Sequence, residues 1–250
     1  MCAGSIANAQ LSAPGPAGPI AYSPGPPTYT QDGEPPVEDN TIFYHLMFDQ
    51  LEGRTSGIEN EFRWDGEGWI GTDMNRLWFK SEGFLENGKV TDGDTEALYD
   101  RPIPHLRYFD VQAGVRYDLD SNPGRTWGAI GIEGLAPYWF QAEPTFYFSN
   151  DGRFAGRFFG SYDLLITNRL IAQPEIETNV YSKSEPVREI GSGLADLDTG
   201  LRIRYEFSRK FAPYIGAAYT QSFGETAALT RAQHGIVHDL RFIVGVRIWY

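Results

Sequence analysis

Histidine and methionine are scarce in this chain of 250 residues, so the search for a metal site starts from few positions. The chain holds four His and three Met, and imidazole and thioether groups are donors that soft and borderline transition metals favour. His45, Met47 and Asp49 occupy alternate positions of one segment. Side chains at alternate positions of a β-strand point to the same face, so we expect these three donors to lie together.

The segment that follows offers a carboxylate partner for this group. A hairpin closed by residues 53–57 would bring Asp65 to the same face, and we expect His45 to lie near Asp65. A carboxylate that orients an imidazole ring is a common partner of a metal ligand. The alternative is that Met47 packs against other side chains and His45 only hydrogen-bonds a carboxylate.

The elements that must position these residues are β-strands. From residue 41 to the end, segments of alternating polarity follow one another, with turn signals between them. In the last segment Leu240, Phe242 and Val244 share one face, whereas Asp239 and Arg241 lie on the other. We predict twelve strands, at residues 41–52, 58–71, 75–86, 93–101, 106–118, 125–135, 137–149, 153–165, 168–181, 195–207, 211–223 and 238–250.

We predict that residues 41–250 form an all-β fold, an antiparallel transmembrane β-barrel of about twelve strands. A soluble β-sandwich also alternates, but its strands are usually about 5–6 residues long. The segments here match the strands of about 9–11 residues that cross a membrane. Short connections alternate with long polar ones at 182–194 and 224–237, and aromatic residues gather at strand ends, as in the girdles of membrane barrels. No segment shows a sustained helical period.

The charged faces of the predicted strands line the barrel lumen. Both signs of charge are interleaved there, which leaves two interpretations open. The charges pair across strands and fill a narrow barrel, or they line a path for small ions. Alternation places in the lumen Glu61, Arg63, Asp65, Glu67, Lys80, Glu82, Asp110, Arg116, Glu133, Glu143, Arg157, Asp163, Glu175, Glu177, Asp198, Arg202, Arg204, Glu206, Arg241 and Arg247.

The remaining metal-binding side chains fall in connections. Asp73 and Met74 lie in one short turn and His105 in the next short turn, so we expect them to flank one mouth of the barrel. The alternative is that they are ordinary exposed turn residues. His234 and His238 lie four residues apart, a spacing that brings ligands together on a helix. The surrounding sequence does not predict a helix, so these two are an external capture site or solvated loop residues.

Residues 1–40 differ from the rest in composition. Ala7-Asn8-Ala9 has the pattern of a signal-peptide cleavage site, and we interpret the first residues as a signal remnant, the alternative being an ordinary disordered cytosolic N-terminus. The Pro and Gly residues that follow predict a disordered linker. We therefore divide the chain into a signal remnant and linker at 1–40 and a barrel at 41–250.

The composition excludes several classes of protein. The net charge of −12 argues against a nucleic-acid partner, because phosphate binding needs clusters of Lys and Arg. The single cysteine, Cys2, excludes a Cys-built zinc or iron–sulfur site. No apolar run is long enough for a transmembrane helix.

Several long motifs resemble the copper resistance protein B family of bacterial outer-membrane proteins. They are DGEGWIGTDMNRLWFKSEG at Asp65–Gly83, FDVQAGVRYD at Phe109–Asp118, RTWGAIGIEGLAPYWF at Arg125–Phe140 and the closing RFIVGVRIWY. The resemblance covers residues 43–250. It implies a barrel in the bacterial outer membrane that binds copper, as Cu(I) or Cu(II), and contributes to resistance or homeostasis by binding or moving copper ions. An even strand number places both termini in the periplasm. The expected partners are copper ions, outer-membrane lipid, and a periplasmic copper oxidase or chaperone.

One departure from the family pattern directs the copper site into the barrel. Members commonly carry a Met- and His-rich N-terminal segment, but residues 1–40 here hold no His and only Met1. The candidate copper ligands are His45, Met47, Asp49, Asp65, Asp73, Met74 and His105. The alternative function is a general small-solute pore, which needs no His or Met in its lumen. A membrane-embedded hydrolase would need a His held near a nucleophile such as Ser, and no such motif is present, so we predict that the protein is not an enzyme.

Overall fold

The computed structural model describes residues 41–250 apart from residues 58–59, 107 and 120–123. The predicted signal remnant and linker at 1–40 lie outside the described residues and stay predictions. The strands are β1 (Phe43–Thr55), β2 (Asn60–Gly71), β3 (Arg76–Glu86), β4 (Lys89–Pro102), β5 (Phe109–Asp118), β6 (Thr126–Ala136), β7 (Phe140–Phe148), β8 (Phe154–Ser161), β9 (Leu164–Leu165), β10 (Leu170–Tyr181), β11 (Gly193–Tyr205), β12 (Phe211–Ser222) and β13 (His238–Trp249). The helices are η1 (Pro137–Trp139), η2 (Pro186–Arg188) and α1 (Gly224–Ala232).

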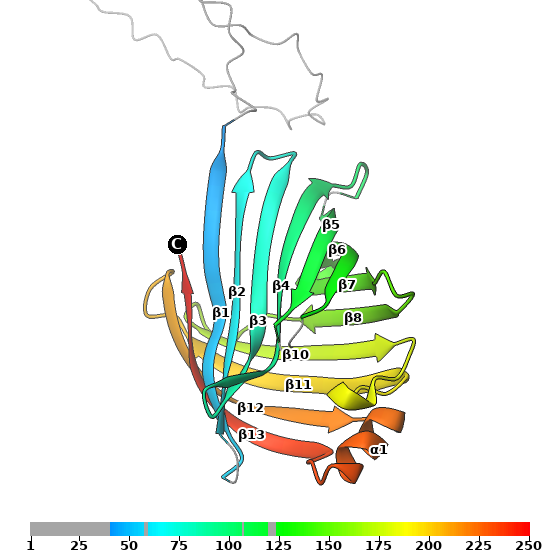
Figure 1. The fold of residues 1–250 in the computed structure, drawn as a ribbon. Coiled ribbons are helices and arrows are strands. Elements are labelled where there is room, and N and C mark those ends of the chain that lie inside the picture. Colours follow the sequence, from blue (N-terminus) through cyan, green and yellow to red (C-terminus); the bar gives the residue numbers. More distant parts are fainter. Residues whose placement is uncertain (1–40, 58–59, 107, 120–123) are drawn as a thin grey trace, which may run out of the picture. The chain divides into compact units, whose positions relative to one another are not determined.

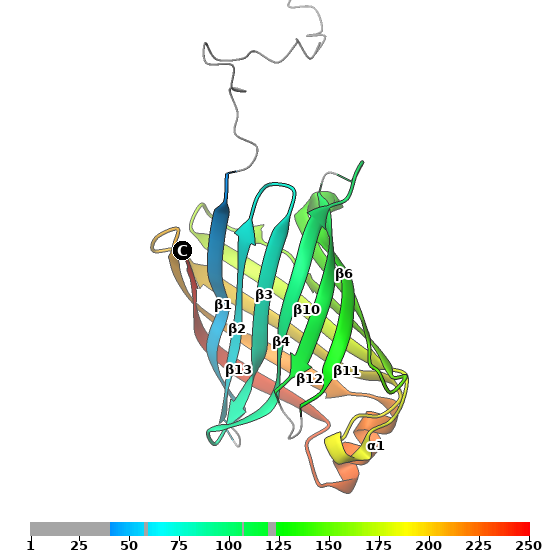
Figure 2. The same cartoon turned by 45° about the horizontal axis from the view of Figure 1, so that its top comes forward.

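The long strands form a closed antiparallel barrel (Figures 1 and 2). Each pairs with its neighbours along the chain, β8 pairs with β10, and β1 pairs with β13 to close the seam. The two-residue strand β9 lies beside β10 as a thirteenth, short strand. The predicted twelve-stranded antiparallel barrel is therefore confirmed. Among the residues that the structure describes, no helix is both long enough and apolar enough to cross a membrane.

The two ends of the barrel differ in their connections. At the end that we call the turn end, residues 72–75 join β2 to β3, and η1 joins β6 to β7. At the other end, which we call the helix end, η2 and α1 lie in the two long connections. The backbone N–H of Ser192 donates to the Glu225 carboxylate of α1 at 2.9 Å, so these connections pack on each other.

The helix α1 corrects the expectation that no segment is helical. Its nine residues, GETAALTRA, are mostly good helix formers, but the segment is too short to show a sustained period. The helix ends before His234, and His238 begins β13. The two histidines therefore do not share a helix face.

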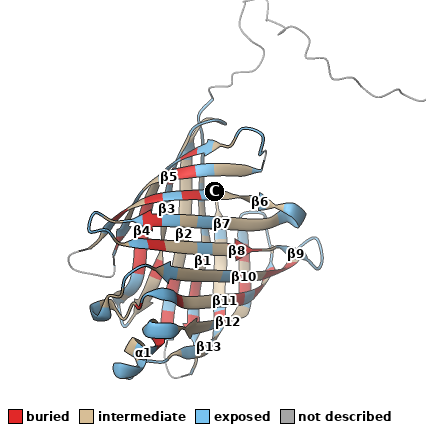
Figure 3. Ribbon diagram, turned by 90° about the vertical axis from the view of Figure 1, so that its right-hand side faces the viewer, coloured by how far each residue is buried: buried red, intermediate tan, exposed pale blue. Residues whose placement is uncertain are grey.

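The barrel is apolar outside and polar inside. Phe242 and Val244 on β13 are 66% and 67% exposed, as expected for side chains that face lipid. The most deeply buried large side chains are mainly polar or charged, namely Arg54, Arg202, Ile243, Gln50, Glu52 and Asp100. Buried and exposed positions follow one another along the strands in Figure 3. This arrangement is the one expected for a membrane barrel whose core is its lumen.

A β-bulge in β1 changes which residues enter the lumen. Phe48 pairs with Gly66 and Gln50 pairs with Asp65, so Asp49 is the extra residue. A bulge of one residue reverses the alternation beyond it. Strict alternation from His45 through Asp49 would have turned Glu52 outward. Instead the inner face passes from Met47 and Asp49 to Gln50, Glu52 and Arg54, which the sequence pattern had not placed in the lumen.

Candidate functional site

Six buried side chains cross the lumen beside the seam between β1 and β13. The Glu52 carboxylate accepts hydrogen bonds from Arg54 Nε at 2.7 Å and from Arg202 Nε at 3.0 Å. The Tyr214 hydroxyl donates to the same carboxylate at 2.9 Å. On the other side, Arg202 Nη1 lies 2.8 Å from the Glu175 carboxylate. We call this group the seam network, and it consists of Gln50, Glu52, Arg54, Glu175, Arg202 and Tyr214.

A glycine makes room for the tyrosine of the seam network. Gly245 on β13 pairs with Glu52 on one side and with Tyr214 on the other. A Cβ atom at this position would lie 2.6 Å from the Tyr214 ring and 2.7 Å from Glu52 Cβ. Only a residue without a side chain therefore lets the tyrosine hydroxyl lie against the carboxylate.

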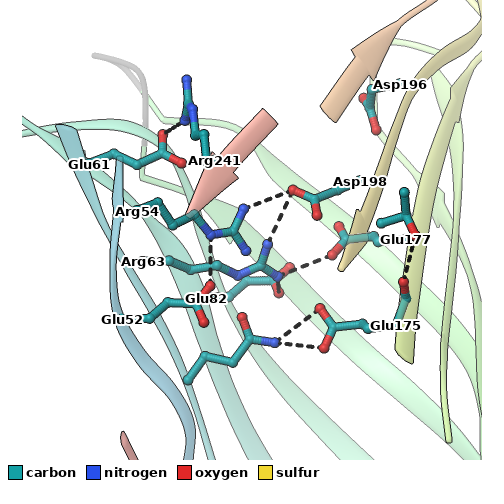
Figure 4. Close-up of polar contacts among 12 residues, drawn as sticks. Glu52, Arg54, Glu61, Arg63, Glu82, Glu175, Glu177, Asp196, Asp198 and Arg241 are labelled. Carbon is teal, nitrogen blue, oxygen red and sulfur yellow. Dashed lines mark hydrogen bonds and ion pairs between the residues drawn. The ribbon is translucent and has the colours of Figure 1, made fainter. Parts of the chain in front are cut away.

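Four further side chains form a closed ring of alternating charge, drawn in part in Figure 4. Arg157 Nη2 donates to Glu82 at 2.6 Å, and Arg157 Nε lies 3.1 Å from Glu177. Arg63 Nη2 lies 3.2 Å from Glu177 and 3.8 Å from Glu82, which closes the ring. These residues come from β2, β3, β8 and β10, so the ring spans the lumen. We call this group of Arg63, Glu82, Arg157 and Glu177 the charge ring.

Asp198 joins the two groups. Its carboxylate accepts from Arg54 Nη1 of the seam network at 2.9 Å and lies 3.9 Å from Arg63 Nη1 of the charge ring. Buried charges are expensive unless they are paired and hydrogen-bonded. Because each arginine here meets at least one carboxylate, the charges are paired, and their side chains extend across the lumen.

On the turn-end side of the charge ring the lumen opens into a cavity of about 280 Å³. Trp139 from η1 lines it at the turn end, and Glu82 and Arg157 line it at the charge ring. Its wall carries eight carboxylates against three cationic side chains, a formal charge of −5. Arg116 and Arg204 do not line the cavity, but they pair with two of its carboxylates, Asp94 and Asp163. Carboxylates still outnumber cationic groups when these two arginines are counted with the wall. We call this space the acidic cavity, and it is suited to attract cations.

Three of the predicted ligands meet at the acidic cavity. Met47, Asp49 and Asp65 all line it, together with Arg247. Arg247 Nε lies 2.7 Å from Asp49, and Arg247 Nη2 donates to the Met47 sulfur at 3.1 Å. The sequence interpretation that placed these three side chains on one face is thus supported by their positions. Their role as metal ligands stays a prediction.

Two carboxylates of the acidic cavity are available to a cation. Glu67 on β2 pairs with Met47 on β1 and also lines the cavity. Within the described part of the chain, neither the Asp65 nor the Glu67 carboxylate has a hydrogen bond or an ion pair. These two groups therefore present acceptor oxygens to the cavity.

The structure separates His45 from Asp65, contrary to expectation. His45 pairs with Trp69, whereas Asp65 pairs with Gln50. The reason is the register of the hairpin, which is set by Thr55 opposite Asn60 and shifted by the bulge. The His45 ring lies between Trp69 and Trp249, with ring centroids 6.4 and 5.7 Å away. His45 does not line the acidic cavity and lies on its turn-end side.

The other candidate ligands lie outside the lumen. Asp73 and Met74 are exposed in the turn between β2 and β3. His105 is exposed in the connection between β4 and β5, where its φ of 74° is in the left-handed region. All three lie at the turn end, and none of them lines the acidic cavity. His234 and His238 are exposed at the helix end.

In the described ranges, no group of three or more His, Cys, Asp or Glu is already arranged to hold a metal ion. A copper ion in the acidic cavity would thus require its donors to move together. Across the same ranges, none of the four histidines donates to or accepts from a serine side chain. The arrangement can attract and hold cations, and it contains no His–Ser pair of the kind that a hydrolase uses.

Gln50, Glu52 and Arg54 are among the lumen residues that sequence reasoning missed, as are Asp94 and Glu96. A signal for the first three exists, because the polar positions change phase where Asp49 and Gln50 adjoin. His45, Met47 and Asp49 follow one alternation, and Gln50, Glu52 and Arg54 follow the other. Two adjacent polar residues with such a change of phase are the pattern of a bulge.

Comparisons with known proteins agree with this architecture. Residues 42–250 match the family described as "Copper resistance protein B precursor (CopB)". "Copper resistance protein B" of Escherichia coli is 42% identical over 214 residues, which are 86% of this chain and 72% of the relative. "Copper resistance protein B homolog" of Pseudomonas syringae pv. tomato (strain ATCC BAA-871 / DC3000) is 37% identical over 250 residues, which are 100% of this chain and 84% of the relative. Among solved structures, the NanC porin shares the fold, with a TM-score of 0.51 and 11% identity over 82% of this chain and 99% of the porin.

Proposed function

Because this chain belongs to the copper resistance protein B family, we propose that its outer-membrane barrel binds copper ions in the lumen and so contributes to copper resistance or homeostasis. Copper is then the substrate that the barrel holds or moves across the membrane. The observation that carries the proposal is the acidic cavity, where Met47, Asp49 and Asp65 line a space of formal charge −5. No catalytic step is part of it.

The donor set of the acidic cavity suits copper in either common oxidation state. Thioether sulfur favours Cu(I), and carboxylate oxygen is accepted by Cu(II). Arg247 contacts both Met47 and Asp49, so a copper ion at these donors would take the place of its guanidinium group. Asp65 and Glu67 add two carboxylates that make no ion pair with the other described residues. The site that we propose therefore assembles around the ion.

We further propose that the turn end faces the periplasm. Both ends of a barrel with an even number of strands emerge on one side, and short turns are typical of the periplasmic side. His45 lies between the acidic cavity and the turn end, and Asp73, Met74 and His105 lie in the turns themselves. In this orientation these side chains would meet copper that is exchanged with a periplasmic copper oxidase or chaperone.

A general small-solute pore is less well supported. The seam network and the charge ring place paired side chains across the lumen. A pore for small solutes would need an open passage there. The lumen also presents Met47 at an acidic cavity, a feature that a general pore does not require.

Copper binding to the purified, detergent-solubilised protein tests the proposal. We expect the double substitution of Met47→Leu with Asp65→Asn to weaken copper affinity by at least about tenfold, the lower limit for loss of a supporting group at a metal site. His45→Ala measures separately whether the histidine takes part. The matched control is His234→Ala with His238→Ala, which removes two imidazoles at the helix end and should leave copper binding unchanged. Unchanged affinity in the Met47/Asp65 variant would refute the cavity site.

A further inference from the structure

The lumen has a second cavity on the other side of the charge ring. It is small, about 60 Å³, and is lined by residues of the helix-end half such as Asp92, Asn179 and Asp196. All four members of the charge ring line this cavity, and two of them, Glu82 and Arg157, also line the acidic cavity. The two cavities are therefore neighbours that share one wall of paired charges.

The seam network fills the lumen next to this wall. Its members come from β1 and from β10, β11 and β12, and Glu52 and Arg202 are almost fully buried. Both cavities are lined by residues of β2, β3, β4 and β8, and the charge-ring residues Glu82 and Arg157 line both of them. A path through the barrel that follows these cavities passes the charge ring and Asp94, which also lines both cavities and pairs with Arg116.

We infer that the two cavities are segments of one cation path and that the charge ring is its closed constriction. Rings of charged side chains set the sign of the ion that a pore admits. The charge ring carries two carboxylates and two guanidinium groups, so its charges cancel and its groups satisfy each other. Carboxylates dominate the acidic cavity that leads to it. Separation of Arg157 from Glu82 opens the layer to hydrated cations.

This inference is separate from copper binding, because potassium conductance is measured without copper. The experiment is the ion conductance of the purified full chain in planar lipid bilayers with potassium chloride. We expect little conductance from the unaltered protein and a several-fold higher conductance from Arg157→Ser. The matched control is Arg204→Ser, which removes a buried arginine that pairs with Asp163 and Gln173 and lines neither cavity.

The sign of the selectivity separates a gate from a general loss of structure. Arg157→Ser leaves two carboxylates and one guanidinium group in the ring, so the reversal potential should move toward that of a cation-selective pore. Glu82→Ser leaves two guanidinium groups and one carboxylate, so it should conduct with selectivity shifted toward anions. If Arg157→Ser does not fold into a heat-resistant barrel, Glu82→Ser tests the same layer from the opposite wall. The inference is overturned if folded variants conduct no more than the unaltered protein, if both shift selectivity in the same direction, or if Arg204→Ser conducts equally well.

Discussion

Removal of the Glu52 carboxylate should destabilise the barrel. The size of the loss in the free energy of unfolding reports whether water reaches the seam network. Glu52 is 0% exposed and accepts from Arg54, Arg202 and Tyr214. Loss of one partner from a buried ion pair costs about 3–5 kcal/mol, because the other charge stays buried. Arg54 keeps Asp198 at 2.9 Å and Arg202 keeps Glu175 at 2.8 Å. We therefore expect Glu52→Ala to cost about 3 kcal/mol, the lower end of that range.

Equilibrium unfolding in urea, followed by tryptophan fluorescence of the barrel in lipid vesicles, measures this cost. The control is Asp151→Ala, which removes an ion pair with Arg153 at the exposed helix end and should change stability little. A cost for Glu52→Ala below about 1 kcal/mol, the range of exposed ion pairs, would refute the reasoning. It would show that water reaches the guanidinium groups and that the seam network does not seal the lumen.

Three further predictions follow from local geometry. Deletion of Asp49 removes the bulge but keeps Met47, Gln50 and Glu52 on the inner face, because Phe48 and Gln50 already lie opposite the adjacent residues Gly66 and Asp65. We therefore expect the heat-resistant barrel to persist on gels, and its loss would contradict the assignment of Asp49 as the extra residue. Gly245→Val should destabilise the barrel because its side chain meets the Tyr214 ring, and Tyr214→Ala in the same chain should recover part of that loss in urea unfolding; additive costs would contradict the contact. Hydrogen bonds from the Ser192 backbone N–H and hydroxyl hold the pKa of the Glu225 carboxyl in α1 below its usual range. The contact therefore stabilises the connection above the usual carboxyl pKa and is lost as the pH falls through the lowered value. The protection of the Ser192 amide, measured as its exchange rate relative to that of an unstructured peptide at the same pH, should fall in acid, and Glu225→Gln should remove this pH dependence.

The strands could be predicted from the sequence because the two faces of each strand lie in different environments. Lipid outside and paired charges inside select opposite side chains at successive positions, as at Phe242 and Arg241 of β13. This alternation gave the strand number, the closed barrel and the lumen position of Met47 and Asp65. It depends only on neighbours along the chain, so a single sequence is sufficient.

Register and contacts across the lumen could not be predicted in the same way. His45 faces Trp69 rather than Asp65 because the hairpin turn and the bulge together set the pairing. The alternation of polar and apolar residues does not determine where a turn is centred, and the turn sets which residues of two strands pair. Nor does the alternation determine that Arg157 on β8 meets Glu82 on β3, since that contact depends on the diameter and tilt of the closed barrel.

The seam network has a consequence for how the barrel forms and how long it persists. Glu52 and Arg202 are 150 residues apart in the chain, and their contact needs β1 to lie beside β13. Bringing such distant parts of a chain together costs loop-closure entropy before the contact contributes any stability, which slows folding. Interactions absent from the folding transition state slow unfolding without accelerating folding. If the seam closes after the transition state, its buried ion pairs slow unfolding and lengthen the lifetime of the assembled barrel.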